Sequence, residues 1–473
     1  MLQLLSADPN FSIFVNALAD AELPEPGADF ASTVFAPPNA AFEAMSQAQL
    51  LAWLDDPTGD MARILQYHLL DYVATDEDVA AAANDTIRTL AGEPLMPTDF
   101  NIIAADIQAS NGIIHVIDAV QVPPTITNAI QTEQLLAEGV PVLRVWADNT
   151  RAPALRDIEL AFEQEYGVEL LIEVIGFGDI RRLFLTAGPA GKGPDILVGA
   201  HDWLGELFSG GLVAPIDLGD KAVDFAPAAL QAFTYNGDLY GMPSATESVG
   251  LFINTDLVAE CPATWTEVRQ ASARLHGVDP DQFGFVRMIG DAYHFYPIQS
   301  AFGGYVFGRN ADGSYNPNDV GIGSEGSIAA GQWLQRMVSE GLQPPAMDWD
   351  TMHAMFESGQ AAMIITGPWA VSRIAESGVP YTICDIPDEA ADGAPFLGAQ
   401  GFMISAFARD PLLAQIFLTE FVATPDVMRA FYDSDRRTPA YLPVLATVDD
   451  PHIAAFASAG TNAHPMPAIP EMN

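Results

Sequence analysis

Residues 193–206 read GPDILVGAHDWLGE and place a histidine and a carboxylate side by side where an apolar run ends. His201 and Asp202 could form part of a metal site, half of a catalytic dyad, or a ligand-binding loop. Adjacent residues at a strand-to-helix turn direct their side chains apart, which disfavours the dyad and the metal site. We expect Asp202 to accept hydrogen bonds from a ligand or to cap the next helix, and His201 to hold the turn.

The other reactive side chains do not form a known catalytic or metal-binding motif. G-x-S-x-G, H-E-x-x-H, P-loop and G-x-G-x-x-G patterns are absent, and the 8 histidines make no i, i+4 pair. His294 lies close to Asp291, but one histidine and one acid make a poor metal site. Asp202 with Glu247, or either with Asp291, could be the paired carboxylates of a glycosidase, although nothing raises the pKa of one of them. We predict no catalytic residue, no metal and no cofactor.

The elements that position these groups alternate between strand and helix from Pro141 onward. We expect strands at 142–147, 168–175 and 195–200, and helices at 154–167 and 179–188. This βαβαβ order predicts an α/β fold with a doubly wound parallel sheet, in which ligands bind beyond the carboxyl ends of the strands. Residues 148–151 follow the first strand and residues 201–203 follow the third, so both groups are expected at the ligand-binding edge.

The first 124 residues have a different pattern. Two β-rich runs flank residues 110–112, Ser-Asn-Gly, which is a hairpin signal. TVFAPPNAAF, Tyr67-His68 and NGIIHVIDAVQVPP resemble the segments of a fasciclin (FAS1) domain. The resemblance implies an α+β domain built on a β-sandwich, of a kind used in adhesion at cell surfaces or in matrix. We interpret His115 as structural, because His115 and Asp118 would fall on opposite faces of a strand.

Seven segments of the remaining chain resemble bacterial extracellular solute-binding proteins of the maltose/maltodextrin-binding type. In order, they are VWADNTRAPALRDIELAFEQEYGVEL, GPDILVGAHDWLGELFSGGLVAPI, YNGDLYGMPSATESVGLFINTDL, PATWTEV, GGYVF, AAMIITGPWAVSRI and MPAIPEM. The resemblance implies a two-lobed periplasmic-binding-protein fold of type II, with hinge strands between the lobes. A sugar held in the cleft between the lobes would be enclosed by hinge closure.

The two resemblances together predict the domain organisation. We expect a fasciclin-like domain over 1–124, a linker or short bridging helix over 125–140, and a solute-binding domain over 141–473. Lobe one would take about 141–246 and 401–446, and lobe two about 250–400 and 447–473. The first crossing between lobes is expected within TESVGLFINTDL, residues 246–257. The resemblance also implies further C-terminal helices beyond residue 473.

A sugar site needs carboxylates, amides or arginine for the hydroxyl groups and flat aromatic surfaces for the C–H faces. The resemblance implies that Trp369 is the platform under a sugar ring and that Asp202 and Glu247 accept hydroxyl hydrogen bonds. Alternatives remain for each: core packing for Trp369 and Tyr293, and a solvated hinge acid for Glu247. The full set of predicted ligand-binding residues is Asp148, Asn149, Arg151, Asp202, Trp203, Glu247, Asp291, Tyr293, Trp369 and Met466.

Three positions depart from the maltose-binding pattern. Gly199 stands where that pattern has tryptophan, Trp203 stands where it has arginine, and Asp291-Ala292 replaces a Glu-Pro pair. One wall of the site is therefore changed. The ligand could be another oligosaccharide or another polyol rather than linear maltodextrin.

The composition excludes several kinds of partner. The formal net charge is −43, from 62 acidic and 19 basic residues, so the field of the protein repels nucleic acid and anionic lipid. No apolar run reaches about 18 residues and no signal peptide is visible. Cys261 and Cys384 form no C-x-x-C motif, and we expect two separate buried thiols unless the fold brings them together.

These observations predict the substrate-binding component of an ABC-type carbohydrate importer. It would capture an oligosaccharide such as maltodextrin outside the cytoplasmic membrane, anchored to a membrane in its full-length form, and deliver the sugar to permease subunits. The fasciclin-like domain would bind a surface or matrix partner. The alternatives are an adhesion or matrix protein with a vestigial cleft, and a glycoside-active enzyme.

Overall fold

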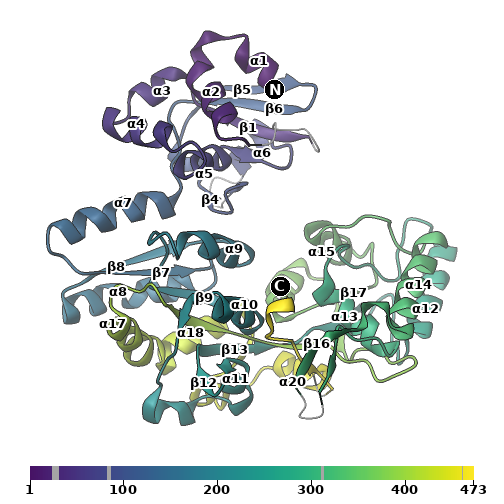
Figure 1. The fold of residues 1–473 in the computed structure, drawn as a ribbon. Helices are drawn as coiled ribbons and strands as arrows, with labels where there is room; N and C mark the ends of the chain where they lie inside the picture. Colours follow the sequence, from purple (N-terminus) through teal and green to yellow (C-terminus); the bar gives the residue numbers. More distant parts are fainter. Residues whose placement is uncertain (24–30, 82–86, 311–313, 461, 473) are drawn as a thin grey trace. The chain divides into compact units, whose positions relative to one another are not determined.

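The computed structural model describes residues 1–23, 31–81, 87–310, 314–460 and 462–472 (Figure 1). The chain divides into two units, residues 1–194 and residues 195–473, and each is described by itself. Within the described residues, no helix has both the length and the apolar character required to cross a membrane.

A four-stranded sheet organises the start of the first unit. Its strand order is β2 (Leu69–Leu70), β1 (Ser32–Ala36), β6 (Gly112–Ile117), β5 (Ile102–Ala109). The predicted hairpin is confirmed, since Ala109 pairs with Gly112. Gly112 has a φ of +143°, and a Cβ atom there would lie 2.0 Å from the carbonyl oxygen of Ser32. Glycine is therefore required for β6 to pair with β1 from this residue onward.

Helices cover this sheet and form a hydrophobic core with it. They are α1 (Leu2–Ser6), α2 (Ser12–Asp20), α3 (Asn39–Glu43), α4 (Gln47–Asp55), α5 (Asp60–Tyr67) and α6 (Asp76–Ala81). Phe14 and Leu18 of α2 are buried in one cluster with Leu65 of α5 and Ile114 of β6. His115 is buried, and its Nε2 lies 2.8 Å from the carbonyl oxygen of Ala74, which agrees with a structural role.

The second half of the first unit contains the start of the predicted alternation. A short β3–β4 pair (Ile87–Arg88, Pro94–Leu95) precedes it, and the segment expected to be a linker or bridging helix contains helix α7 (Pro124–Ala137). Strands β7 (Val142–Ala147) and β8 (Glu169–Val174) are parallel, and α8 (Ala152–Tyr166) and α9 (Phe177–Ala187) pack against them (Figure 1). The predicted strands and helices over 142–188 therefore form within two residues of the expected bounds.

The first sheet of the second unit has the strand order β20 (Thr438–Pro439), β13 (Met242–Glu247), β19 (Phe396–Ser405), β9 (Ile196–Ala200). Strands β10 (Val213–Ala214) and β21 (His464–Pro465) also pair with β19. Glu247 at the end of β13 lies opposite Gly398 of β19, and Thr246 lies opposite Thr438 of β20. Strands from three distant parts of the sequence thus meet around Glu247.

The second sheet has the order β17 (Met363–Thr366), β14 (Gly250–Asn254), β18 (Tyr381–Cys384). The chain passes from the first sheet to the second between Glu247 and Gly250, inside the segment where the first lobe crossing is predicted. Two short hairpins, β11–β12 (Thr234–Tyr235, Asp238–Leu239) and β15–β16 (Phe307–Arg309, Tyr315–Val320), lie outside these sheets.

Helices pack against both sheets of the second unit, and those on the second sheet bury two aromatic and aliphatic clusters against it. They are α10 (Leu204–Ser209), α11 (Pro227–Ala232), α12 (Trp265–Val278), α13 (Ala292–Ala301), α14 (Glu325–Ser339), α15 (Trp349–Glu357), α16 (Val371–Ser377), α17 (Pro411–Ile416), α18 (Pro425–Asp435), α19 (Leu442–Leu445) and α20 (Pro451–Ala459). Two 3₁₀ turns matter for the site: η4 (His201–Trp203) and η7 (Pro368–Ala370).

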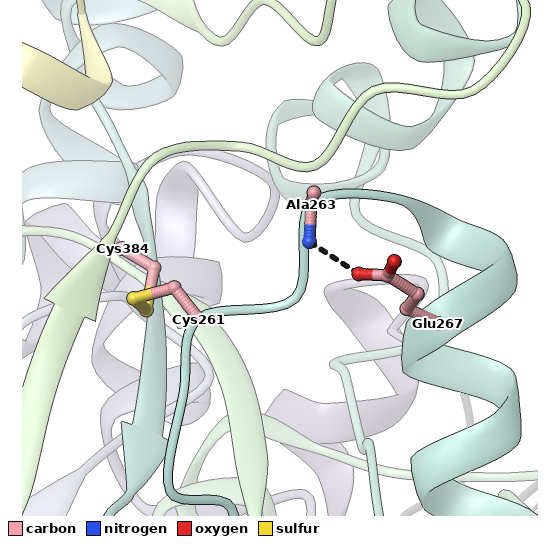
Figure 2. Close-up of a disulfide and its surroundings, with 4 residues drawn as sticks. All are labelled: Cys261, Ala263, Glu267 and Cys384. Atoms are coloured by element: carbon pink, nitrogen blue, oxygen red, sulfur yellow. Dashed lines mark hydrogen bonds between the residues drawn. A yellow bond between two sulfur atoms is a disulfide. The ribbon is translucent and has the colours of Figure 1, made fainter.

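A disulfide joins Cys261 and Cys384, so the expectation of two separate thiols is wrong (Figure 2). The two cysteines are 123 residues apart in sequence. Beside the disulfide, Glu267 accepts a hydrogen bond from the backbone N–H of Ala263 at 2.7 Å, and the Thr264 hydroxyl oxygen accepts one from the N–H of Glu267 at 3.1 Å. This reciprocal cap and the disulfide together fix the start of α12 next to strand β18.

Candidate functional site

The predicted ligand residues of the first unit lie in the turn between β7 and α8. Asp148 accepts hydrogen bonds from the backbone N–H groups of Thr150 at 2.9 Å and Arg151 at 3.1 Å, and its other oxygen pairs with the Arg151 guanidinium. Asp148 and Arg151 are buried, whereas Asn149 is exposed. These are the contacts of a turn that starts a helix. A ligand-binding role for the three residues remains a prediction.

His201 connects the end of β9 to two other parts of the second unit. The backbone N–H of Ala399 donates to its Nδ1 at 3.1 Å, and its Nε2 lies 3.2 Å from the carbonyl oxygen of Met466. Both ring nitrogens are therefore engaged with backbone groups, as expected for a residue that holds the turn. Asp202 follows and is buried in the same 3₁₀ turn.

Trp203 and Gly199 are in direct contact. A Cβ atom at Gly199 would lie 2.4 Å from Cε of Met403 and 2.7 Å from Cε3 of Trp203. The indole ring of Trp203 thus lies against the space where a side chain at residue 199 would begin. The two residues that depart from the maltose-binding pattern are therefore neighbours in the fold.

Glu247 lies at the centre of a network of charged and polar groups. Its Oε1 accepts a hydrogen bond from Gln400 at 3.0 Å, and its Oε2 pairs with Nε of Arg437. A Cβ atom at Gly398 would lie 3.0 Å from Cγ of Glu247 and 3.6 Å from the hydroxyl oxygen of Tyr293. The acid and the tyrosine therefore face the same point of β19.

Tyr293 has a buried hydroxyl oxygen with no hydrogen-bond partner among the described residues. Burial raises the pKa of this phenol well above its ordinary value, and the negative charges of Glu247, Asp202 and Asp291 raise it further, while Arg437 opposes them. The hydroxyl therefore stays protonated. It can donate to, and accept from, a ligand oxygen.

Asp291 begins helix α13 and pairs with His294 in its first turn. One carboxylate oxygen accepts a hydrogen bond from the N–H of Tyr293 at 2.8 Å, and the other contacts Nδ1 of His294. Burial opposes ionisation of Asp291, but the hydrogen bonds and charge of His294 outweigh it and lower the pKa of the carboxyl. Asp291 thus acts as a helix cap that also orients His294.

Trp369 is half-buried in the turn after β17 and is surrounded by other rings. The centroid of its ring lies 5.9 Å from that of His294, 6.2 Å from that of Tyr293 and 6.5 Å from that of Trp349. The guanidinium carbon of Arg437 lies 5.3 Å from the ring centroid. A partly exposed indole braced by other rings is suited to stack against a flat apolar surface.

Two cavities lie next to the predicted site residues, and Thr246 and Leu397 line both cavities. The smaller, about 170 Å³, includes Glu247, and the larger, about 420 Å³, includes Met466 and His201. Tyr235 and Tyr315 also line the larger cavity. A further cavity of about 740 Å³ lies beside the disulfide and contains none of the predicted residues.

The structure therefore brings part of the predicted set together. Glu247, Asp291, Tyr293 and Trp369 form one cluster with Arg437, and Met466 lies at the neighbouring cavity. The turn with Asp202 and Trp203 approaches it through His201, which also lines that cavity. Arg437, His294, Trp349, Tyr235 and Tyr315 are additional residues that were not predicted. Only the His294–Asp291 spacing was visible in the sequence, and it was weighed as a metal site.

Within the described residues, no group of three or more His, Cys, Asp or Glu side chains is arranged to hold a metal ion. The site consists of carboxylates, one guanidinium, a phenol and indole rings. Such groups bind by hydrogen bonding and stacking.

Comparison with known proteins gives two family matches. Residues 160–461 match the model of the bacterial extracellular solute-binding proteins, and residues 9–123 match the model of the fasciclin domain. The galactooligosaccharide-binding protein of Bacillus subtilis (strain 168) is 31% identical over 346 residues, which are 70% of this chain and 81% of that protein.

Two further relatives have similar coverage. The maltodextrin-binding protein MdxE of Bacillus subtilis (strain 168) is 30% identical over 353 residues, 71% of this chain and 82% of that protein. The maltooligosaccharide ABC transporter solute-binding lipoprotein of Streptococcus pneumoniae is 26% identical over 348 residues, 71% of this chain and 81% of that protein.

Proposed function

The chain belongs to the bacterial extracellular solute-binding protein family and carries an N-terminal fasciclin domain, and from this premise we propose that it captures an oligosaccharide for an ABC-type importer. The observation that carries the proposal is the cluster of Glu247, Tyr293 and Trp369 where the chain crosses between two sheets. Carboxylates and the unpartnered phenol can bind sugar hydroxyls, and the half-buried indole can stack on the C–H face of a ring.

Capture would use the crossing between the sheets as a hinge. Trp369 and Tyr293 belong to the side of the second sheet, whereas Glu247 ends a strand of the first. A sugar that contacts all three residues binds more tightly when both sides close on it. Binding therefore favours closure, and closure favours binding. Delivery of the sugar to permease subunits outside the cytoplasmic membrane, by a protein anchored to that membrane, completes the proposal.

The class of sugar is proposed as an oligosaccharide of the maltodextrin or galactooligosaccharide kind, because the similar proteins carry these two names. The residues Gly199 and Trp203 change one wall of the site. Experiment must therefore decide between a maltodextrin and a galactooligosaccharide. The family is one of binding proteins, so Glu247 and Asp202 are assigned to binding rather than to glycoside hydrolysis.

The fasciclin domain is proposed to hold a surface or matrix partner while the solute-binding part collects sugar. An adhesion role for the whole chain is the second candidate, and the fasciclin domain is the observation that favours it. It predicts that no sugar binds in the cleft.

Isothermal titration of the full chain with maltose, maltotriose and a galactotriose tests the proposal. We expect saturable binding of at least one trisaccharide, because the half-buried Trp369 ring can stack on a sugar ring while Glu247 and Tyr293 accept or donate hydroxyl hydrogen bonds. No heat of binding from any of the three sugars to the folded protein would contradict transport and favour the adhesion role.

A further inference from the structure

Arg437 contacts both an acid and an aromatic ring that the proposed function assigns to sugar. Its Nε pairs with the Glu247 carboxylate and its Nη1 pairs with Asp435. Its guanidinium carbon lies 5.3 Å from the centroid of the Trp369 ring. One side chain thus connects the acid to the aromatic platform.

Strand pairing explains this arrangement. Strand β20 runs antiparallel to β13, with Thr246 opposite Thr438. Glu247 follows Thr246 and Arg437 precedes Thr438, so the antiparallel direction brings these two residues side by side. Trp369 comes from the turn after β17, which belongs to the other sheet. Arg437 therefore links the two sheets at the crossing that the proposed function uses as a hinge.

These contacts fix the position of the Glu247 carboxylate and leave it able to accept further hydrogen bonds. Arg437 binds one carboxylate oxygen, Gln400 donates to the other at 3.0 Å, and each oxygen keeps a lone pair for a sugar hydroxyl. The Glu247 and Arg437 side chains are only 10% and 12% exposed, so neither moves freely into solvent. A carboxylate held in place before the ligand arrives loses little freedom on binding.

We propose that Arg437 is a positioning residue that holds Glu247 and Trp369 in one geometry, and that the carboxylates around it restrict the site to neutral oligosaccharides. Two carboxylates, Glu247 and Asp435, already pair with its single positive charge, and Asp291 lies near the same cluster. Asp202 adds a further negative charge to the cluster, and the second cation near Asp291, Arg287, is buried. A sugar carboxylate would therefore meet more negative than positive charge. This inference rests on the proposed function, because it assigns a role to Arg437 within the same site.

The test compares four proteins: wild type, Arg437→Gln, Arg437→Lys and Arg436→Gln. Arg436 is the matched control, because it is the adjacent arginine, at the C-cap of α18, and stacks on Tyr432 with its guanidinium carbon 5.2 Å from that ring centroid. Titration with maltotriose and with a galactotriose should show at least tenfold weaker binding for Arg437→Gln, partial recovery for Arg437→Lys and less than a twofold change for Arg436→Gln. A trigalacturonate should not bind wild type.

Two further readouts separate positioning from a general loss of structure. Without any sugar, Arg437→Gln should change the tryptophan emission when it is made in wild type. The same substitution made in the Trp369→Phe variant should leave the emission unchanged. In a double-mutant cycle, Arg437→Gln and Glu247→Gln should weaken binding together by less than the product of their separate effects.

Equal sugar affinity in wild type and Arg437→Gln, additive effects in the cycle, or binding of the trigalacturonate would overturn the inference while leaving the proposed function standing. If wild type bound neither neutral trisaccharide, the proposed function would be overturned and the inference with it.

Discussion

At the scale of single residues, Gly199 and Trp203 form a contact that the sequence does not reveal. The sequence shows that both positions depart from the maltose-binding pattern, but it does not show that they touch. In the structure the Trp203 ring lies against Gly199, where a Cβ atom would come within 2.7 Å of it. The Trp203 ring thus occupies the space beside Gly199 at the end of β9.

Gly199→Ala should destabilise the protein by about 1–3 kcal/mol, because the new methyl group would be forced against Met403 and Trp203 in a packed interior. Urea unfolding followed by circular dichroism measures the change. Gly331→Ala is the control: Gly331 lies inside helix α14 with open space around it, so alanine there should be neutral or stabilising by up to about 1 kcal/mol. Equal stabilities of the two variants would refute the packing argument.

The partners of the site residues were harder to predict than the residues themselves. Glu247 and Trp369 stand in segments that resemble a known pattern, so the sequence points to them directly. Arg437 lies 190 residues after Glu247, and only the return of β20 beside β13 brings them together. Neither periodicity nor spacing along the chain carries that information.

At the scale of secondary-structure elements, the β7–β8 pair contains a buried ion pair. Arg144 of β7 donates from Nε to Glu173 of β8 at 2.8 Å, and the indole N–H of Trp146 donates to the other Glu173 oxygen at 2.9 Å. Arg144 and Glu173 have no exposed side-chain surface. Burial raises the pKa of Glu173 to about 7, although Arg144 and the hydrogen bonds act in the opposite direction.

The raised pKa of Glu173 predicts a fall in stability between pH 4.5 and pH 7. In this window the unfolded chain has already lost the Glu173 proton while the folded chain still holds it, so the free energy of unfolding decreases as pH rises. The contribution is at most about 3 kcal/mol. Urea unfolding of wild type and Glu173→Gln at pH 5 and pH 7 measures it.

The difference between the two proteins isolates Glu173 from the other acids. Wild type should lose more stability than Glu173→Gln over this pH range, and the exposed control Glu165→Gln should follow wild type. The same pH slope in wild type and Glu173→Gln would show that this carboxyl does not titrate as predicted.

Local patterns predicted the elements well, and contacts across the fold poorly. Strands and helices between residues 142 and 188 form within two residues of their predicted bounds, because hydrophobic periodicity is a local property. The Cys261–Cys384 disulfide was not predicted, since 123 residues separate the cysteines and the pairing depends on where β18 lies next to the start of α12.

At the scale of the whole molecule, the chain combines a fasciclin domain with a solute-binding protein. Both could be identified from sequence because each leaves several ordered segments, and the strand–helix alternation supports the second independently. The boundaries between them, the sugar and the partner of the fasciclin domain remain predictions. A net charge of −43 disfavours nucleic acid as a partner.

The central claim is that a sugar binds on Trp369, and one titration tests it directly. Calorimetry should measure the affinity of wild type, Trp369→Ala and Trp53→Phe for one sugar, either maltotriose or galactotriose, whichever binds wild type. Trp53 is a buried tryptophan of the fasciclin domain. We predict at least tenfold weaker binding for Trp369→Ala, or about 1.4 kcal/mol, and unchanged binding for Trp53→Phe. Wild-type affinity in Trp369→Ala would contradict the account.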